Sequence, residues 1–465
     1  MLTSLAVSNF RSLRDVKVKF SASGLTVIVG ANGTGKSNLI KCLEFLGTIP
    51  REGLENTIRA NNGADAILPK ALSMAQCRAT EVKFTYTVDL PRIDGYPADG
   101  PAVQVAHELS IQALDTRRFI NKEERLLFSE PLLVQAAINA AAGLPHEAEV
   151  PPSWLLMQSE LGGEVSINGT PPIGGRHLGG YLEWLGFPFL KPTFEKLAEK
   201  DLAAALKQLL RPTSVGRNAS DLGERRLSCL VDPNGPAMLL FSSHARAFKE
   251  FMSGIRRFDL QLSQLRKQQD ISSTKELLSD GRGLPAAVRN LKAHGGESGD
   301  WRRLALTLAE LAPHVSDTSI SQLKSGQEFV QFIESRTGRP VESWQSSDGT
   351  LRALAILLAV ETHPSSGTIL IEEPEQGLHP WAVRSLVLHL RRVIAERRIQ
   401  VILTTHSQQV LDSVEPSEVL VASRSSSAVT HFRTISEITG SEKLEVGELG
   451  RMWVSGVLGG VPSYE

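Results

Sequence analysis

The most informative stretch of the sequence is Gly-Ala-Asn-Gly-Thr-Gly-Lys-Ser at residues 30–37. A short apolar run rich in β-branched residues, Leu25–Val29, precedes it, and Leu39, Leu43 and Leu46 follow at helical spacing. The order is therefore strand, glycine-rich loop, helix. The loop matches the pattern GxxxxGK[ST], in which glycines let backbone N–H groups close around phosphates at a helix N-terminus.

This loop predicts a site for ATP and Mg²⁺. We expect the ammonium of Lys36 to reach the β- and γ-phosphates and the hydroxyl of Ser37 to ligate Mg²⁺. The remaining nucleotide contacts are expected from the loop and the start of its helix: Gly30, Asn32, Gly33, Thr34, Gly35 and Asn38.

Two carboxylates end a second apolar run, Ile-Leu-Ile-Glu-Glu at residues 369–373. Where such a strand ends beside a phosphate loop, Glu372 can hold Mg²⁺ through water, and Glu373 can act as general base on the attacking water. His406 follows a further apolar run, 33 residues after Glu373, and is a candidate sensor of the γ-phosphate. In isolation, the acidic pair is more typical of a solvated loop and the histidine of a structural residue.

The C-terminal third alternates strongly between helical and extended patterns. This alternation predicts a mainly parallel sheet with helices on both faces. Near the N-terminus, residues 15–20 alternate with period two and predict a half-exposed strand. The expected elements of the C-terminal third are helices at 350–360 and 380–397 and strands at 368–371, 401–404, 419–422 and 429–435. Between residues 100 and 340, short helices such as 193–210 are expected, and no heptad pattern is sustained.

Together these motifs resemble the ABC-type ATPase superfamily, in its branch of RecF-like and SMC-like enzymes. They are also similar to predicted bacterial ATPases related to the overcoming-lysogenization-defect nucleases. The resemblance covers about residues 1–50 and 340–460. It rests on Asn-Phe-Arg-Ser-Leu at 9–13, the Walker A loop at 30–37, the signature Ser-Asp-Gly-Thr-Leu-Arg at 347–352, Walker B with the D-loop at 371–380, and the switch Thr-Thr-His-Ser at 404–407.

The resemblance implies an α/β fold with an ABC-type ATPase head. Such a head has a P-loop and a mainly parallel sheet, an antiparallel N-terminal lobe, and a large, mostly helical insertion. The domains expected on this basis are an N-terminal ATPase lobe at 1–100, an inserted region at 101–335, and a C-terminal ATPase lobe at 336–465.

It also implies a site shared between two subunits. Ser347 and Gly349 would contact the γ-phosphate across a head-to-head dimer, while His406 would act from the subunit that carries the Walker motifs. Arg11 could approach the nucleotide, and a surface salt bridge is an equal alternative. Two positions depart from the pattern, since Ser346 stands where Leu is commoner and Glu372 where broader ABC ATPases carry Asp.

Composition says little about partners. The formal net charge is −1, so no global basic field indicates nucleic acid, although arginine doublets at 256–257, 391–392 and 397–398 keep that possibility open. Three cysteines without a CxxC pair, no long apolar run and no leader pattern predict a cytoplasmic protein with no membrane segment. A glutamine of the Q-loop type is not clear; Gln76 is the nearest candidate, with a surface role as its alternative. Arg352 could couple nucleotide to the insertion or simply interrupt an apolar face.

Several functions compete on this sequence. We expect an ATP-hydrolysing switch that closes a nucleotide-dependent dimer, and the resemblance implies a separately encoded effector and a role in defence against phage. The alternative is a RecF-like DNA repair ATPase that binds DNA directly. A built-in nuclease is disfavoured because only 59 residues follow His406. An SMC-type scaffold would need a long coiled coil, and a transporter ATPase a shorter chain.

Overall fold

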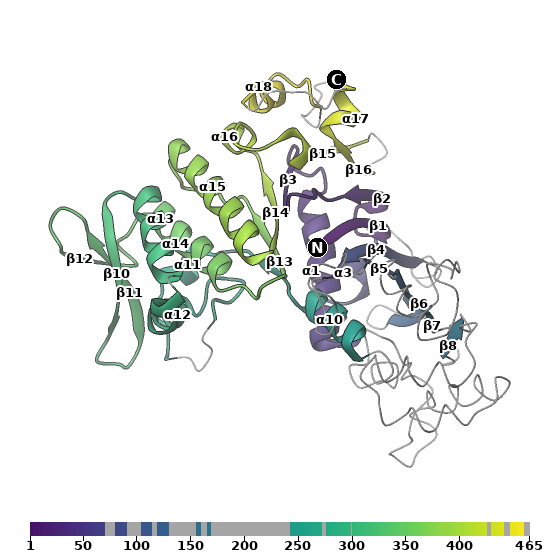
Figure 1. Cartoon of the computed structure of the whole chain (residues 1–465), viewed down its shortest axis with the longest axis horizontal. Helices are drawn as coiled ribbons and strands as arrows, with labels where there is room; N and C mark the ends of the chain where they lie inside the picture. The colour runs from purple at the N-terminus through teal and green to yellow at the C-terminus, as the bar shows by residue number, and fades with distance from the viewer. Residues whose placement is uncertain are drawn as a thin grey trace, which may run out of the picture. The chain divides into compact units, whose positions relative to one another are not determined.

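The computed structural model describes the chain in segments that form two compact units. The first unit comprises residues 1–19 and 45–253, and the second comprises residues 20–44 and 254–465 (Figure 1). The described segments are 1–69, 80–90, 104–113, 119–129, 155–159, 165–168, 242–271, 276–298, 300–425, 429–440 and 447–459.

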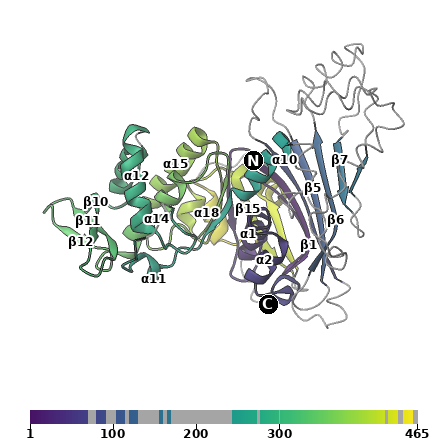
Figure 2. The ribbon, with the colours of Figure 1, turned by 90° about the horizontal axis from the view of Figure 1, so that it is seen from below.

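The first unit is built on a seven-stranded sheet in the order β2-β1-β4-β5-β6-β7-β8, several strands of which are labelled in Figure 2. Each neighbouring pair is antiparallel. In β2, Val16 and Val18 are buried whereas Asp15, Lys17 and Lys19 are exposed, so the alternation predicted at 15–20 is confirmed. The strands are β1 (Leu2–Phe10), β2 (Leu13–Lys19), β4 (Glu81–Asp89), β5 (Gln104–Ala113), β6 (Phe119–Ser129), β7 (Leu155–Ser159) and β8 (Val165–Asn168).

Aromatic side chains join helices to this sheet. The ring of Phe45, from α1, lies 5.6 Å from that of Phe10 and 5.8 Å from that of Phe84, centroid to centroid. The ring of Phe248, from α10, lies 6.3 Å from that of Tyr86. Such ring pairs add specific packing to the burial of apolar area. The helices of this unit are the end of α1 (Lys36–Glu52), α2 (Leu54–Ala60), α3 (Ala64–Ile67) and α10 (Ser242–Ser253).

The second unit is built on a six-stranded sheet in the order β16-β15-β3-β14-β13-β9. All pairings are parallel except that of β15 with β16. Every residue of β3 and β14 is buried, as expected for strands covered on both faces. The strands are β3 (Leu25–Val29), β9 (Ile255–Phe258), β13 (Thr368–Glu372), β14 (Gln400–Thr405), β15 (Val419–Arg424) and β16 (Thr430–Thr434).

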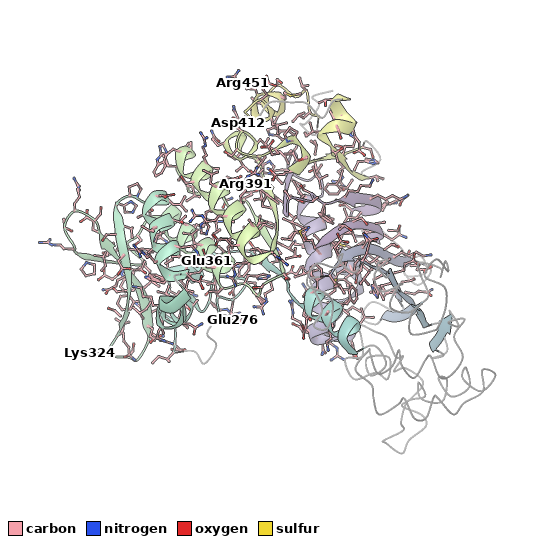
Figure 3. The ribbon with its side chains drawn as sticks, viewed as in Figure 1. Glu276, Lys324, Glu361, Arg391, Asp412 and Arg451 are labelled. Atoms are coloured by element: carbon pink, nitrogen blue, oxygen red, sulfur yellow. The ribbon has the colours of Figure 1, made fainter. Side chains whose placement is uncertain are left out.

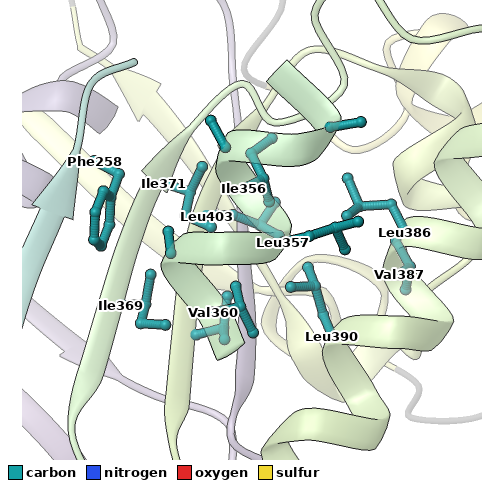
Figure 4. Packing of buried hydrophobic residues seen from close by; sticks show 14 of the residues in the cluster. Phe258, Ile356, Leu357, Val360, Ile369, Ile371, Leu386, Val387, Leu390 and Leu403 are labelled. Carbon is teal, nitrogen blue, oxygen red and sulfur yellow. The ribbon is translucent and has the colours of Figure 1, made fainter. Parts of the chain in front are cut away.

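One hydrophobic core ties helices α14 and α15 to this sheet. Ile356 and Val360 from α14, Leu390 from α15, Ile369 of β13 and Leu403 of β14 all belong to this buried cluster (Figure 4). Because α14 is buried along nearly its whole length, a change at either end of it is felt in the core. The other elements of this unit are α11 (Leu262–Leu265), α12 (Leu284–Ser298), α13 (Asp300–Leu311), α14 (Asp348–Glu361), α15 (Pro380–Arg397), α16 (Gln408–Leu411), the 3₁₀ turn η1 (Pro416–Glu418), α17 (Ile435–Thr439) and α18 (Leu449–Val454). A small sheet contains β10 (Val315–Gln322), β11 (Glu328–Glu334) and β12 (Pro340–Glu342).

The α/β class and the mostly parallel sheet with an antiparallel N-terminal lobe are confirmed. All the elements expected between residues 350 and 435 are present within about two residues of the expected bounds. The described part of the inserted region contains strands β5 to β11 as well as helices, and the helix expected at 193–210 lies outside the described residues. The domain boundaries at 100 and 335 stay predictions. In the described residues, no helix is long and apolar enough to cross a membrane.

Candidate functional site

The glycine loop leaves β3 and turns directly into α1. Gly33 and Gly35 have φ values of +79° and +106°, a conformation that glycine adopts without steric cost. A Cβ at Gly30 would lie 2.4 Å from the carbonyl oxygen of Ala422 in β15, so only glycine fits there. The amide of Asn38 donates to the carbonyl of Gly35, which starts the helix. The loop therefore has the tight backbone that a phosphate cradle requires.

Lys36 lies inside this loop with a relative exposure of 6%. Its Nζ donates to the carbonyl oxygens of Gly30, at 2.6 Å, and Ala31, at 3.0 Å, and lies 3.0 Å from Nε2 of His406. Burial lowers the pKa of Lys36 to about 8, against the opposing charges of Glu373 and Glu372. The side chain thus remains mostly cationic at neutral pH.

His406 follows β14, the strand next to β3 in the sheet. Burial, and then the charge of Lys36, lower the pKa of its imidazole, so the ring is neutral at pH 7. Since Lys36 donates to Nε2, the proton of the neutral ring resides on Nδ1. Nε2 also lies 3.7 Å from Oε1 of Glu373. The three residues expected to act on the γ-phosphate are thus brought together.

Glu373 has a backbone conformation that is unusual for a residue with a side chain. Its φ is +47°, and its amide donates to the carbonyl of Thr404 at 2.9 Å. The Oε2 atom accepts a hydrogen bond from Nε2 of Gln376 at 2.6 Å. Backbone strain of this kind concentrates at functional sites, because the surrounding structure must hold it in place.

Glu372 and Ser37 supply oxygen atoms of the kind that Mg²⁺ prefers. The Ser37 hydroxyl donates to Oε2 of Glu372 at 2.5 Å, and Nε of Arg257 donates to Oε1 at 2.9 Å. In the part of the chain that the structure describes, no group of three or more His, Cys, Asp or Glu side chains could hold a metal ion. A pair of protein oxygens fits Mg²⁺, which keeps several waters and takes further ligands from substrate phosphates.

Glu375 was missed by the sequence reasoning. Its Oε1 accepts hydrogen bonds from the Thr405 hydroxyl at 2.5 Å and from the amide of His406 at 3.3 Å. Burial raises the pKa of this carboxyl, and hydrogen bonds partly offset the effect. Glu375 therefore ties the segment after β13 to the segment after β14. The only sequence signal for Glu375 was its position two residues after Glu373.

The signature segment begins α14. Ser347 is exposed and is the N-cap of this helix, where its Oγ accepts from the amide of Thr350 at 3.2 Å. Gly349 is buried, and a Cβ there would lie 2.1 Å from the carbonyl oxygen of Gly377 in the D-loop. Arg352 lies one turn further along α14 and is partly buried.

Arg266 holds the loop that leads into the signature, and no sequence pattern pointed to this residue. Its Nη1 donates to the carbonyl of Trp344 at 2.8 Å, and its Nη2 to the carbonyl of Ser346 at 3.1 Å. The same guanidinium pairs with Asp348. The Ser346 hydroxyl, at the position where Leu is commoner, donates to a backbone carbonyl.

Arg11 and Gln76 were also expected to contribute to the nucleotide site. Arg11 belongs to the first unit, where it has a φ of +53° and its amide donates to the carbonyl of Ile67 at 2.7 Å. Gln76 lies outside the described residues. The nucleotide role of both stays a prediction.

Most of the arginines in the three doublets bind groups of this chain. Arg256 pairs with Glu276 and Arg391 with Glu418, each at 2.6 Å (Figure 3). Arg397 donates to a backbone carbonyl after α14. These contacts leave the doublets without support as a surface for nucleic acid.

Two family models match the chain, and together they include every motif described above. Residues 1–77 match a model described as "AAA ATPase domain". Residues 231–412 match one described as "AAA domain, putative AbiEii toxin, Type IV TA system". Two segments of the chain are thus similar to AAA-type ATPase domains. Its two matching segments hold the phosphate loop and Walker B respectively, and no curated protein sequence matches the chain.

Solved structures similar to this chain include SMC head domains. An SMC head bound to the C-terminal winged-helix domain of ScpA is 13% identical, with a TM-score of 0.46, covering 95% of this chain and 99% of that one. An SMC head with an extended coiled coil, bound to the C-terminal domain of ScpA derived from Pyrococcus furiosus, is 16% identical, with a TM-score of 0.39 and coverage of 93% and 96%. The SMC head of Thermotoga maritima is 12% identical, with a TM-score of 0.38 and coverage of 93% and 98%.

Proposed function

We propose that this protein binds ATP with Mg²⁺ and hydrolyses it to ADP and phosphate. The observation that carries the proposal is the meeting of Lys36, Glu373 and His406 at one edge of the parallel sheet, with His406 Nε2 at 3.0 Å from Lys36 Nζ and 3.7 Å from Glu373 Oε1. A cation, a carboxylate and an imidazole placed beside a phosphate loop suit transfer of a phosphoryl group to water, which needs mainly positioning and charge stabilisation.

When ATP binds, Lys36 exchanges one of its present hydrogen-bond acceptors for a phosphate oxygen. Its ammonium donates to Gly30 O, Ala31 O and His406 Nε2, and a phosphate oxygen replaces one of these because charged acceptors make stronger hydrogen bonds. His406 then meets the γ-phosphate with Nε2, which must carry the ring proton to donate. Ser37 and Glu372 would hold Mg²⁺, which would neutralise part of the phosphate charge.

Glu373 takes the proton of the attacking water. The Gln376 amide holds Oε2, so Oε1 is the atom left to act as the base. About one third of its side chain is exposed, which gives water access to the carboxylate. The strained backbone at Glu373 and its hydrogen bond to Thr404 fix the direction of this side chain.

The complete site is shared by two subunits that close head to head on ATP. Ser347 supports this arrangement because it is exposed and because, among the described residues, its hydroxyl bonds to Thr350, within its own turn. Ser347, with the backbone at Gly349, is thus available to a nucleotide carried by another copy. Closure of the dimer completes the site, and ATP binding is thereby coupled to a change of assembly.

The output of the switch passes to a separately encoded partner protein, in defence against phage. The description of the model that matches residues 231–412, which names a toxin of a toxin–antitoxin system, supports a protein that works with a second component. A relation to the ATPase part of overcoming-lysogenization-defect nucleases is part of this proposal. Direct DNA binding of the RecF type is not, because the arginine doublets that suggested it mostly bind this chain's own groups.

The test is phosphate release by the purified protein, measured with ATP in Mg²⁺ and in EDTA. Phosphate release that requires Mg²⁺ is expected. Light scattering with and without ATP, on a protein whose turnover is blocked, tests closure of the dimer. No phosphate release above a protein-free control would contradict hydrolysis, whereas an unchanged mass would contradict only the dimer.

A further inference from the structure

Arg257 lies beside the expected magnesium site on a strand that the sequence analysis left unassigned. Strand β9 pairs in parallel with β13, and Arg257 is opposite Leu370. Side chains two apart on a strand share a face, so Arg257, Leu370 and Glu372 point to the same side of the sheet. Nε of Arg257 donates to Oε1 of Glu372 at 2.9 Å.

Three carboxylates hold this guanidinium. Besides Glu372, Glu44 of α1 lies 3.3 Å from Nη1 and Asp259 lies 2.7 Å from Nη2. The side chain of Arg257 is only 15% exposed. Burial alone would lower the pKa of Arg257, but Glu44, Glu372 and Asp259 raise it. The guanidinium is therefore a fixed cation, and its planar fork cannot turn without breaking several contacts at once.

The two carboxylate oxygens of Glu372 have different hydrogen-bond partners. Oε1 accepts from Arg257, while Oε2 accepts from the hydroxyl of Ser37, the other expected Mg²⁺ ligand. A carboxylate held at one oxygen cannot rotate freely about its last bond. Carboxylates and imidazoles that bind metals are commonly held in this way, and loss of the outer partner weakens metal binding.

The charge around Arg257 favours a divalent cation rather than repelling it. Three carboxylates surround one guanidinium, which leaves a net charge of −2 for the group of Glu44, Asp259, Glu372 and Arg257. Arg257 can thus orient Glu372 without cancelling the attraction for Mg²⁺. Arg256, the next residue on the strand, points to the opposite face and pairs with Glu276.

We propose that Arg257 is a positioning residue for Mg²⁺: it holds Oε1 of Glu372 so that Oε2 faces the ion together with Ser37. This rests on the proposed ATP-binding function and adds a residue that none of the sequence motifs contains. The role is orientation, since Arg257 touches Glu372 and not the expected place of the nucleotide phosphates.

The experiment measures binding of the non-hydrolysed ATP analogue adenylyl imidodiphosphate by calorimetry, in EDTA and at increasing free Mg²⁺. For Arg257→Gln, the Mg²⁺ concentration that gives half of the gain in affinity should rise about 10- to 100-fold. The affinity in EDTA should stay within about twofold of wild type. Arg257→Lys keeps the charge but loses the fork and should fall between the two. Arg256→Gln is the matched control and should behave as wild type.

The outcomes separate the two proposals. An unchanged Mg²⁺ midpoint in Arg257→Gln would overturn the role of Arg257 and leave ATP binding intact. Loss of binding in EDTA in both Arg257→Gln and Arg257→Lys would assign the arginine a purely structural role and also overturn it. Wild-type protein that does not bind the analogue would instead overturn the proposed function itself.

Discussion

Nζ of Lys36 lies 3.0 Å from Nε2 of His406, although the two residues are 370 positions apart in the chain. Strands β3 and β14 are parallel neighbours, with Val29 opposite Thr405, so residues that follow these strands meet at one edge of the sheet. The lysine of the phosphate loop and the histidine of the switch segment therefore lie side by side at this edge.

Lys36→Ala should abolish ATP turnover, because it removes the cation that offsets the charge of the β- and γ-phosphates. Loss of one such electrostatic contact typically lowers the rate by about 10²- to 10³-fold. Phosphate release with Mg²⁺ and ATP is the measurement. Lys41→Ala, on the same helix, is the control and should retain turnover. Wild-type turnover in Lys36→Ala would remove the central residue from the proposed mechanism.

Glu372 and Glu373 are adjacent but should have different roles. Glu373→Gln keeps the shape of the side chain and removes the base, so ATP should still bind while hydrolysis falls by about 10²- to 10⁴-fold. Glu372→Gln should instead raise the Mg²⁺ concentration needed for ATP binding. Calorimetry with ATP at several Mg²⁺ concentrations, together with phosphate release, distinguishes the two variants. Identical binding behaviour of both would show that this division of roles is wrong.

The sequence was sufficient for the parts of the site that lie in contiguous motifs. The glycine loop, the two glutamates and the switch histidine each follow a buried strand, and parallel strands bring such ends together. Arg257, Glu375 and Arg266 could not be found in this way. Each acts through a contact with a distant segment. Arg257 lies in a short strand, Glu375 follows one and Arg266 ends a short helix, and a lone charged residue in such a place looks like a surface charge.

Prediction of the fold was limited in the same way, because a strand can be predicted only where its residues form a clear apolar pattern. Strands β13 and β14 are apolar runs bounded by turns, so their positions were predictable. The short strand β9, Ile255–Phe258, carries two arginines among its four residues and gives no such pattern. Its place at the sheet edge is decided by pairing with β13.

Gly349→Ala should destabilise the protein, although the same change in an open helix is stabilising by up to about 1 kcal/mol. The new methyl would lie 2.1 Å from the carbonyl oxygen of Gly377, and backbone must move to admit it. The expected cost is about 1–3 kcal/mol in the free energy of unfolding, measured by urea denaturation. Ser347→Ala, which removes only the helix cap, is the comparison and should cost about 1 kcal/mol. A stabilised Gly349→Ala protein would contradict the close packing of these two segments.

His389 should make stability fall in mild acid. It is buried, with Nε2 3.5 Å from Oε1 of Glu361, which is labelled in Figure 3. Burial, with repulsion from Arg392 and Arg303, lowers its pKa from 6.5 to about 4. Between these pH values the unfolded chain binds a proton that the folded imidazole does not, so the stability present above pH 6.5 is lost as pH falls.

The size of this loss of stability follows from the difference between the pKa values of His389 in the unfolded and the folded chain. Between pH 7.5 and pH 5, wild type should lose about 2 kcal/mol more unfolding free energy than His389→Asn, whose amide can still bond to Thr307. Burial raises the pKa of Glu361, which acts in the opposite direction in both proteins. Urea denaturation at several pH values gives the comparison. Parallel pH profiles for the two proteins would rule out His389 as the titrating group.

Ser347→Arg should block turnover while leaving ATP binding to a single subunit nearly unchanged. The hydroxyl at this position is exposed and bonds only within its own turn, so in the proposed dimer it serves the nucleotide of the opposite subunit. Lys36→Ala has the complementary defect, since it spoils the phosphate loop and leaves the signature intact.

Mixing the two inactive proteins should therefore restore some phosphate release. In a hybrid dimer, one of the two composite sites combines an intact Lys36 with an intact Ser347, and that site can turn over unless both sites must act together. If both sites must act together, mixing will restore no activity even in a shared-site dimer. A second measurement therefore uses Glu373→Gln protein, which should retain ATP. Its mass is measured by light scattering with and without ATP. No recovery on mixing, together with a mass that ATP leaves at the monomer value, would refute the shared site. A dimer that is already present without ATP would contradict only the nucleotide dependence of dimerisation. In that case, recovery of activity on mixing would decide whether the two sites are shared between subunits.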